Sequence, residues 1–311
     1  MMFMVKHFLS IKDLSRKEIE FLIKKSIEIK KNPKKYSSAM KEKTLFMLFE
    51  APSLRTRVSF EAGMTQLGGH AIYYSIDEST LGKKESIKDF TKTVSRYCDI
   101  IMARIYRHDQ LEEMAANADI PVINAMTNFE HPCQILTDLM TIHEKKLLKG
   151  KLAYLGDGFN NVTHSLLYGC SIMGMDIAVA SPAGKEYEPD KKVVQEAKKF
   201  GVKSGSRVLL THNPKEAVKN ASIVYTDSWM SYRISKEQEP KRVKIFKPHQ
   251  VNAALMKLAK PKAVFMHCLP AKRGHEVTDE VLDSKQSIVF DQAENRLHAQ
   301  KALMLWLLRK I

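Results

Sequence analysis

Short apolar runs alternate along the chain with segments whose apolar residues recur at helical spacing. The runs suit buried strands, because strands of a parallel sheet are covered on both faces and read as continuous apolar stretches. Strand and helix signals then follow one another to the end of the chain, and this order predicts a parallel α/β fold. The predicted strands cover residues 44–49, 71–76, 100–103, 121–124, 152–155, 177–180, 208–210, 223–225, 264–266 and 288–290.

A charged segment, Lys145 to Lys151, interrupts the pattern, which then starts again. We therefore predict two doubly wound domains, residues 1–148 and 149–311, with the last helix, about 294–311, packing back on the first domain. Ligands of such folds bind beyond the carboxyl ends of the strands, so one cleft between the two domains is expected to hold the active site.

Helix ends and one irregular segment complete this outline. Ser15 and Glu18 have the spacing of a capping box and predict the start of the first helix, which reaches Lys31. Gly68-Gly69 predict the end of the helix that follows strand 44–49. Residues 228–249 carry many charges and few apolar side chains, and we expect them to form a mobile excursion.

The turn after strand 44–49 is the most informative stretch for function. It places Ser53, Arg55, Thr56 and Arg57 between the strand and a helix. The first backbone N–H groups of a helix lack intrahelical partners, and the helix dipole is positive there. Arginine adds planar donors that match phosphate oxygens in pairs, so the turn predicts a site for an anion such as phosphate. A capping hydroxyl beside solvated arginines is the alternative interpretation.

The charge balance of the 311-residue chain also indicates anionic partners. Lys and Arg number 50 against 35 Asp and Glu, a net charge of +15. Nucleic acid, a membrane surface or small anionic substrates would suit this excess. The lysines are scattered through helical segments and no basic strand is interleaved with aromatic residues, which argues against nucleic acid. No window approaches 18 uncharged apolar residues, so no membrane span is expected.

The cysteines indicate the cellular compartment. They lie far apart and form no Cys-x-x-Cys pair, which predicts neither a disulfide framework nor a zinc site. The apolar start, Met1 to Val5, is too short for a signal peptide. We therefore expect a soluble cytoplasmic protein with reduced thiols. The cysteines are Cys98, Cys133, Cys170 and Cys268.

Two polar stretches after predicted strands are open to more than one interpretation. Gly156 to Asn161 resembles a dinucleotide-binding turn only loosely, because Asn161 stands where the third glycine belongs. The Asn161 amide could instead bind a ligand carboxylate or cap a helix. His131 and Gln134 at a helix start could polarise a carbonyl and hold an amide, although a lone histidine is often structural. Neighbouring Glu130 and His143 supply no third ligand at metal spacing, so no metal is expected.

Two further stretches lie near the C-terminus. His267 and Cys268 could form a nucleophilic pair, but adjacent strand residues point to opposite faces, which argues against covalent cysteine catalysis. Arg296, early in the last helix, is either a surface charge or a further anion contact.

Six of these stretches together resemble the aspartate/ornithine carbamoyltransferase family, and most closely its ornithine branch. The matches run in family order along nearly the whole chain. They are Ser-Leu-Arg-Thr-Arg at 53–57, His-Pro-Cys-Gln at 131–134, Asn160-Asn161, Asp-Ser-Trp-Met-Ser at 227–231, His-Cys-Leu-Pro at 267–270 and Glu-Asn-Arg-Leu-His at 294–298.

The resemblance implies a site for carbamoyl phosphate. Ser53, Leu54, Arg55, Thr56 and Arg57 would hold the phosphate, with Leu54 acting through its backbone. The carbonyl would be polarised by Thr56, Arg104 and His131. The amide would be held by Gln134 and by the backbone of Cys268 and Leu269, and Arg296 would add a contact.

The resemblance also implies the acceptor and the reaction. Asn161, Asp227, Ser231 and the neighbouring Tyr232 would bind L-ornithine, with Cys268 close to the attacking amine. The amine would attack the carbamoyl carbon directly, pass through a tetrahedral oxyanion and expel phosphate to give citrulline. Among these residues, the catalytic ones would be Arg55, Arg104, His131, Asp227 and Cys268. No metal or redox cofactor would be needed.

The family further implies a homotrimer, or a multiple of trimers, in which a neighbouring subunit's loop completes each site. That loop is about Ser79 to Glu85 here, where Thr80 replaces the usual glutamine and Lys84 is a candidate contact. Ser231-Tyr232-Arg233 likewise departs from the usual Ser-Met-Gly of the loop that recognises the amino acid.

Other acceptors and other functions stay open at this point. The altered loop makes putrescine the nearest alternative acceptor, although Asp227 and Asn161 favour an amino-acid end group. Aspartate is disfavoured because its branch usually has proline in place of Cys268. A non-catalytic anion sensor or nucleic-acid binder would also explain the charge, but neither would need His131, Gln134 and Asp227.

Overall fold

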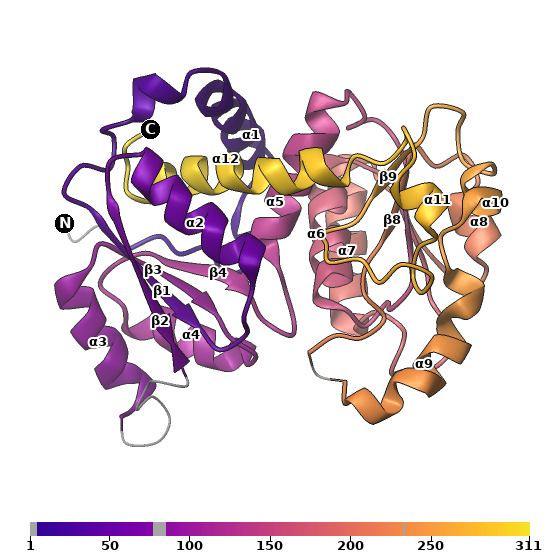
Figure 1. The fold of residues 1–311 in the computed structure, drawn as a ribbon, viewed down its shortest axis with the longest axis horizontal. Helices are drawn as coiled ribbons and strands as arrows, with labels where there is room; N and C mark the ends of the chain where they lie inside the picture. Colours follow the sequence, from indigo (N-terminus) through magenta and orange to yellow (C-terminus); the bar gives the residue numbers. More distant parts are fainter. Residues whose placement is uncertain (1–4, 77–84, 233) are drawn as a thin grey trace. The chain divides into compact units, whose positions relative to one another are not determined.

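A computed structural model describes residues 5–76, 85–232 and 234–311. The chain divides into two compact units (Figure 1). Unit 1 consists of Met1–Met140 together with Glu294–Ile311, and unit 2 of Thr141–Ala293. Each unit is described separately below.

Unit 1 is built on a parallel sheet with strand order β2-β1-β3-β4. The strands are β1 (Thr44–Phe49), β2 (His70–Ser75), β3 (Ile100–Arg104) and β4 (Val122–Met126). Every residue of β3 and β4 is buried, whereas the edge strand β2 is partly exposed. This difference explains why β3 and β4 are mainly apolar, with Arg104 and Asn124 as their polar residues.

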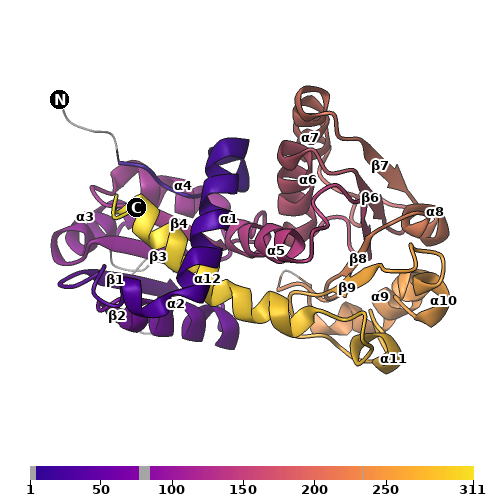
Figure 2. The same cartoon turned by 90° about the horizontal axis from the view of Figure 1, so that it is seen from above.

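Helices cover both faces of this sheet (Figures 1 and 2). Because parallel crossovers are right-handed, α2 lies on one face, and α3 and α4 lie together on the other. The helix α12 lies beside α1 and α2 on the α2 face. The helices of unit 1 are α1 (Arg16–Lys31), α2 (Leu54–Gln66), α3 (Ile87–Tyr97), α4 (His108–Asn117), most of α5 (Pro132–Glu144) and most of α12 (Val289–Leu307).

Unit 2 repeats the layout on a parallel sheet of order β7-β6-β5-β8-β9. Its strands are β5 (Leu152–Leu155), β6 (Ile177–Ala180), β7 (Val208–Thr211), β8 (Ile223–Thr226) and β9 (Val264–Met266). The helices α6 and α7 pack on one face, and α8, α10 and α11 on the other (Figure 1). The helices are α6 (Asn161–Met173), α7 (Lys191–Ser204), α8 (Pro214–Val218), α9 (Glu239–Phe246), α10 (Ala253–Met256) and α11 (Asp279–Leu282).

The predicted α/β class with two parallel sheets is confirmed, and nine of the ten predicted strands are present. The capping box of Ser15 and Glu18 opens α1, and Gly68, in the left-handed region, follows the end of α2. In the described part of the chain, no helix is long and apolar enough to cross a membrane.

The tenth strand, 288–290, was predicted wrongly. Val289 opens α12 instead, and Phe290 is exposed. A three-residue apolar run has the same appearance at the start of a helix as in a buried strand, and only the packing of its side chains distinguishes the two.

The prediction of a mobile excursion at 228–249 was also wrong. This segment contains α9 and two short 3-10 helices, and its Trp229, Arg242 and Phe246 are buried. Its charges misled the prediction because one of them, Arg242, forms a buried ion pair in place of a solvated one.

Candidate functional site

In unit 1, the turn of Ser53 to Arg57 that follows β1 forms the N-terminus of α2. Ser53 is the N-cap, and its hydroxyl accepts a hydrogen bond from the Thr56 N–H at 3.3 Å. The Ser53 hydroxyl also donates to Thr56 Oγ1 at 3.2 Å. The capping role proposed as an alternative is therefore real for Ser53. It does not exclude a ligand, because a cap satisfies only one of the first N–H groups of a helix.

Buried arginines converge on Thr56. Arg104, at the end of β3, donates from Nη1 to Thr56 Oγ1 at 3.4 Å and from Nε to the Ala51 carbonyl at 3.0 Å. Arg296 of α12 donates from Nη2 to the same hydroxyl at 3.3 Å. The two guanidiniums are 5% and 3% exposed, so their charges lie in a low-dielectric environment where electrostatic interactions are strong.

Arg296 is positioned by two amide side chains. Its Nη1 donates to Gln134 Oε1 at 2.7 Å. Gln300 is oriented with its oxygen toward Arg296, where it accepts from Nη2 at 2.9 Å and from Nε at 3.0 Å. Gln134 in turn donates to Asp138 at 2.8 Å. Arg296 is thus no surface charge, and the predicted anion contact stays a prediction.

His131 lies in the field of these cations. Burial, and then the charges of Arg296, Arg104 and Arg55, hold the pKa of His131 well below its ordinary value. The imidazole is therefore neutral at pH 7 and can donate or accept a hydrogen bond without adding a further positive charge.

The remaining predicted residues of this turn are more exposed. Arg55 is half-buried, while the Leu54 side chain is 73% exposed, consistent with a role for its backbone alone. Arg57 donates to Glu61 at 3.2 Å, and its guanidinium lies 3.9 Å from the centre of the Tyr73 ring. Thr80 and Lys84 lie outside the described residues.

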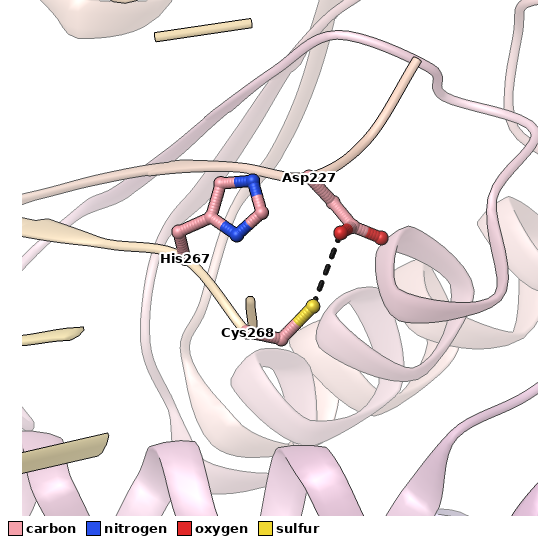
Figure 3. A group of neighbouring side chains, drawn as sticks. All are labelled: Asp227, His267 and Cys268. Atoms are coloured by element: carbon pink, nitrogen blue, oxygen red, sulfur yellow. Dashed lines mark hydrogen bonds between the residues drawn. The ribbon is translucent and has the colours of Figure 1, made fainter. Parts of the chain in front are cut away.

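In unit 2, Asp227 after β8 is the centre of a second group (Figure 3). Its Oδ1 accepts from Cys268 Sγ at 3.1 Å, and its Oδ2 accepts from Asn160 Nδ2 at 3.0 Å. The carboxylate is only 9% exposed, so both contacts fix its orientation in a largely dry environment.

Asn161 and Asn160 have different places in this group. Asn160 is the N-cap of α6 and accepts from the Val162 N–H at 2.7 Å, while Asn161 is the first helical residue and is half-buried. Ser231 is half-buried and Tyr232 is 51% exposed. The capping role considered for Asn161 therefore belongs to Asn160.

A buried ion pair ties the segment after Asp227 to the turn before α6. Arg242 donates from Nη2 to Asp157 Oδ2 at 2.7 Å and from Nε to the Trp229 carbonyl at 2.7 Å. Asp157 is fully buried and Arg242 nearly so. This pair links Asn160 and Asp227 indirectly, because Asp157 and Trp229 lie close to them in the chain.

Asp227, His267 and Cys268 also satisfy the geometry of a small metal-binding group, with one ligand atom each within 4.8 Å of the others. However, His267 Nδ1 already accepts from the Leu269 N–H at 2.8 Å. The Cys268 thiol bonds to Asp227 and not to His267, which gives no support to a nucleophilic pair. The absence of a metal stays a prediction.

Five residues that support these two groups were not identified from the sequence. Asp138 and Gln300 each lie four positions after a predicted residue, so helical spacing could have found them. Asn160 adjoins Asn161, and its capping position is a recognisable signal. Asp157 and Arg242 are 85 positions apart, and no local pattern joins them.

Comparison with protein families finds one family model for each half of the chain. The model described as "Aspartate/ornithine carbamoyltransferase, carbamoyl-P binding domain" matches residues 6–144, and that described as "Aspartate/ornithine carbamoyltransferase, Asp/Orn binding domain" matches residues 149–307. Together they account for nearly the whole chain. The chain belongs to the aspartate/ornithine carbamoyltransferase family. Arg296 falls within the second family domain but forms its contacts in unit 1.

Several ornithine carbamoyltransferases are similar over their full length. That of Bacillus subtilis (strain 168) is 50% identical over 98% of this chain and 94% of its own. The structure of the Pyrococcus furiosus enzyme is 48% identical, with a TM-score of 0.92 over 96% of each chain. The anabolic enzyme of Campylobacter jejuni is 35% identical, with a TM-score of 0.92 over 98% of this chain and 100% of its own.

Proposed function

We propose that this protein transfers the carbamoyl group of carbamoyl phosphate to the side-chain amine of L-ornithine, giving L-citrulline and phosphate. The observation that carries the proposal is the convergence of the buried Arg104 and Arg296 on Thr56, with a neutral His131 in the field of these arginines and of Arg55. These groups suit an anion that also carries a carbonyl. The family membership and the ornithine carbamoyltransferases named above support the same reaction.

In this proposal most of the groups that bind carbamoyl phosphate belong to unit 1. The N–H groups at the start of α2, with Ser53, Arg55, Thr56 and Arg57, hold the phosphate. Arg104, His131 and Thr56 donate toward the carbonyl oxygen, and Gln134 and the backbone of Cys268 and Leu269 hold the amide. Arg296 adds a charged donor beside Thr56. Carbamoyl phosphate is expected to need both the phosphate and the carbonyl contacts for full affinity.

Ornithine binds to unit 2 in this proposal. Asn161, Asp227 and Ser231 hold its α-carboxylate and α-amino groups, Tyr232 lies beside them, and Cys268 lies close to the attacking amine. The Asp227 carboxylate, oriented by Asn160 and Cys268, is the natural partner of an ammonium group.

The amine must lose its proton before it attacks. With an ordinary pKa of about 10.4, deprotonation at pH 7 costs roughly 4.6 kcal/mol, and positive charge around the bound amine would lower this cost. The new C–N bond forms through a tetrahedral oxyanion stabilised by Arg104 and His131. The bond between the carbonyl carbon and the phosphate oxygen then breaks, and the departing phosphate takes the proton that the nitrogen loses after the C–N bond has formed. The proton that the ammonium group loses before the attack goes to the solvent.

Putrescine is the alternative acceptor suggested by Tyr232 and Arg233. The relatives named above are ornithine carbamoyltransferases, so they do not favour it. Asp227 and Asn161 would also have no α-amino acid group to bind in putrescine.

We further propose a cytoplasmic homotrimer that works in arginine biosynthesis, in which residues 1–148 bind carbamoyl phosphate and 149–311 bind ornithine. The anabolic C. jejuni relative supports the direction. Light scattering coupled to gel filtration tests the trimer, which requires three times the 35.5 kDa of the chain. A mass of one chain would contradict it.

An assay of carbamoylated product with carbamoyl phosphate and ornithine, putrescine, N-acetylornithine or aspartate in parallel tests the proposed reaction. We expect turnover with ornithine and at least about tenfold lower kcat/KM with each of the others, since one lost charged hydrogen bond has this effect. Turnover with none of the four amines would refute the enzymatic function, and a preference for putrescine would refute the acceptor.

A further inference from the structure

The backbone between Cys268 and Leu269 adopts a conformation that its own sequence does not favour. Leu269 has a φ of +60°, in the left-handed region that side chains other than glycine rarely adopt. Such a conformation persists only where surrounding groups determine it. Cys268 immediately precedes this residue and bonds to Asp227, so whatever holds Leu269 also sets the position of the thiol.

His267 supplies the contact that holds Leu269. Its Nδ1 accepts from the Leu269 N–H at 2.8 Å, and the imidazole is fully buried. An N–H donor requires a lone pair on its partner, so Nδ1 must be unprotonated and the ring proton must lie on Nε2. With the other tautomer, two N–H groups would face each other and the contact would be lost.

Glu276 lies where it selects this tautomer. Its Oε1 is 3.4 Å from His267 Nε2, a charge contact and not a hydrogen bond, and both side chains are at most 1% exposed. The same oxygen accepts from the Lys272 N–H at 2.6 Å, which fixes the carboxylate in place. A buried carboxylate beside Nε2 favours a proton on that nitrogen, and therefore a lone pair on Nδ1.

The main chain on either side is held independently of this pair. The His267 N–H donates to Gln292 Oε1 at 3.0 Å, and the Glu276 carbonyl accepts from the Val251 N–H at 2.9 Å. Exchanging the imidazole or the carboxylate therefore leaves both anchors in place. Such an exchange removes either the acceptor of the Leu269 N–H hydrogen bond or the carboxylate beside that acceptor's ring.

We propose that Glu276 and His267 are positioning residues for the amine-binding side of the site. Glu276 sets the tautomer of His267, His267 holds Leu269 in its left-handed conformation, and this conformation aims the Cys268 thiol at Asp227. Neither residue touches a substrate. The proposal rests on the proposed carbamoyl transfer to ornithine, since it assigns the pair to the residues that meet the amine.

The exchange Glu276→Gln tests the first link. A glutamine that keeps its oxygen for the Lys272 N–H also keeps that oxygen beside Nε2 and loses only the negative charge, so the preference for a proton on Nε2 is removed while the size of the side chain is kept. We expect the KM for ornithine to rise and kcat to fall, each by about tenfold, the usual effect of one misplaced hydrogen bond. The inhibition constant of inorganic phosphate, which binds to unit 1, should not change.

A matched pair of amides tests the second link. In His267→Asn the side-chain oxygen lies near the position of Nδ1 and can still accept from Leu269, whereas in His267→Gln it lies near Nε2 and cannot. We expect His267→Asn to retain most of the wild-type kcat/KM for ornithine and His267→Gln to lose at least about tenfold. The thermal midpoints of all variants are measured alongside.

The outcomes separate this inference from the proposed function. A wild-type protein that carbamoylates no amine refutes the function itself. With an active wild type, unchanged kinetics in Glu276→Gln would overturn the positioning role. Equal activity in the two His267 variants would also overturn the positioning role. So would losses of kcat/KM that only parallel the losses of thermal midpoint, because a role in packing predicts each of these two results. If one His267 variant does not fold, the Glu276→Gln kinetics decide alone.

Discussion

Two buried arginines of unit 1, Arg104 and Arg296, donate hydrogen bonds to neutral groups. Arg104 donates to the Ala51 carbonyl, and Arg296 is held by the amides of Gln134 and Gln300. Contacts with neutral acceptors fix a guanidinium without cancelling its charge. This arrangement leaves the charge directed at an incoming anion, as the proposed function requires.

At this scale we predict that Arg55→Ala removes turnover and leaves the fold intact. Arg55 contributes to the positive field at His131 and lies in the first turn of α2. Losing one charged hydrogen bond costs about 1.5–3 kcal/mol, so kcat/KM for carbamoyl phosphate should fall at least tenfold. Steady-state kinetics and a carbamoyl phosphate titration measure this.

The matched control for that change is Arg16→Ala in α1. Arg16 is exposed and pairs with Glu20, so its loss should leave kinetics unchanged. Normal affinity for carbamoyl phosphate in Arg55→Ala would contradict the role assigned to Arg55.

His131 predicts a pH dependence of stability. Its pKa is lowered in the folded state, so below about pH 6.5 the unfolded chain binds a proton that the folded chain does not. As the pH is lowered below about 6.5, the free energy of unfolding should therefore decrease more steeply in the wild type than in His131→Gln. The difference in slope is at most about 1.4 kcal/mol per pH unit.

Urea unfolding of both proteins between about pH 7.5 and 5.5 measures the difference. The comparison isolates His131, because the other histidines with lowered pKa values are present in both proteins. A difference that does not vary with pH would show that the imidazole titrates normally in the folded state.

Among the elements, α9 depends on a buried ion pair. Arg242 on α9 contacts Asp157 and the Trp229 carbonyl, and its guanidinium lies 4.6 Å from the centre of the Phe246 ring. Removing one partner of a buried pair leaves an uncompensated charge, which is more costly than the pair itself contributes.

We therefore predict that Arg242→Met destabilises the protein by about 3–5 kcal/mol and raises the KM for ornithine, since Asp157 and Trp229 lie near Asn160 and Asp227. The double exchange Arg242→Met with Asp157→Leu should recover part of the stability. Removing the exposed pair of Arg207 and Asp176 should cost at most about 1 kcal/mol. Chemical denaturation measures all three, and equal losses would contradict the burial argument.

The strands show which elements a sequence can predict. β3 and β4 were found because every residue is buried and most of them are apolar. The segment 288–290 is equally apolar, but only Ile288 and Val289 are buried there, and the helical continuation decides its structure. Local pattern therefore identified strands well and failed where a helix begins with apolar residues.

The site shows a similar limit. Ser53, Thr56 and Arg104 could be proposed from the sequence because each lies at or just after the end of a buried strand, where polar residues stand out. Arg242 and Glu276 could not be predicted, since they act through partners brought close only by the fold. Candidate site residues that lie on one short stretch can be recognised in a sequence. The residues that position them from elsewhere in the chain usually cannot.

For the molecule as a whole, the net charge of +15 should act on the two substrates in opposite directions. A positive field attracts anionic carbamoyl phosphate and repels cationic ornithine, and salt screens both effects. Raising the ionic strength from roughly 0.01 to 0.15 M should lower kcat/KM for carbamoyl phosphate and leave that for ornithine unchanged or higher. Stopped-flow or steady-state rates measure this, and parallel losses for both substrates would contradict it.

The division of the chain into units has a consequence for biosynthesis. Unit 1 includes Glu294–Ile311, and its Arg296, Leu303 and Met304 are buried there. These residues leave the ribosome after all of unit 2. Until unit 2 and the last segment have been synthesised, part of the apolar surface of Met1–Met140 therefore stays uncovered, and the proposed anion site lacks one arginine. A nascent chain released at the end of unit 2 should neither bind phosphate with full affinity nor stay soluble without chaperones.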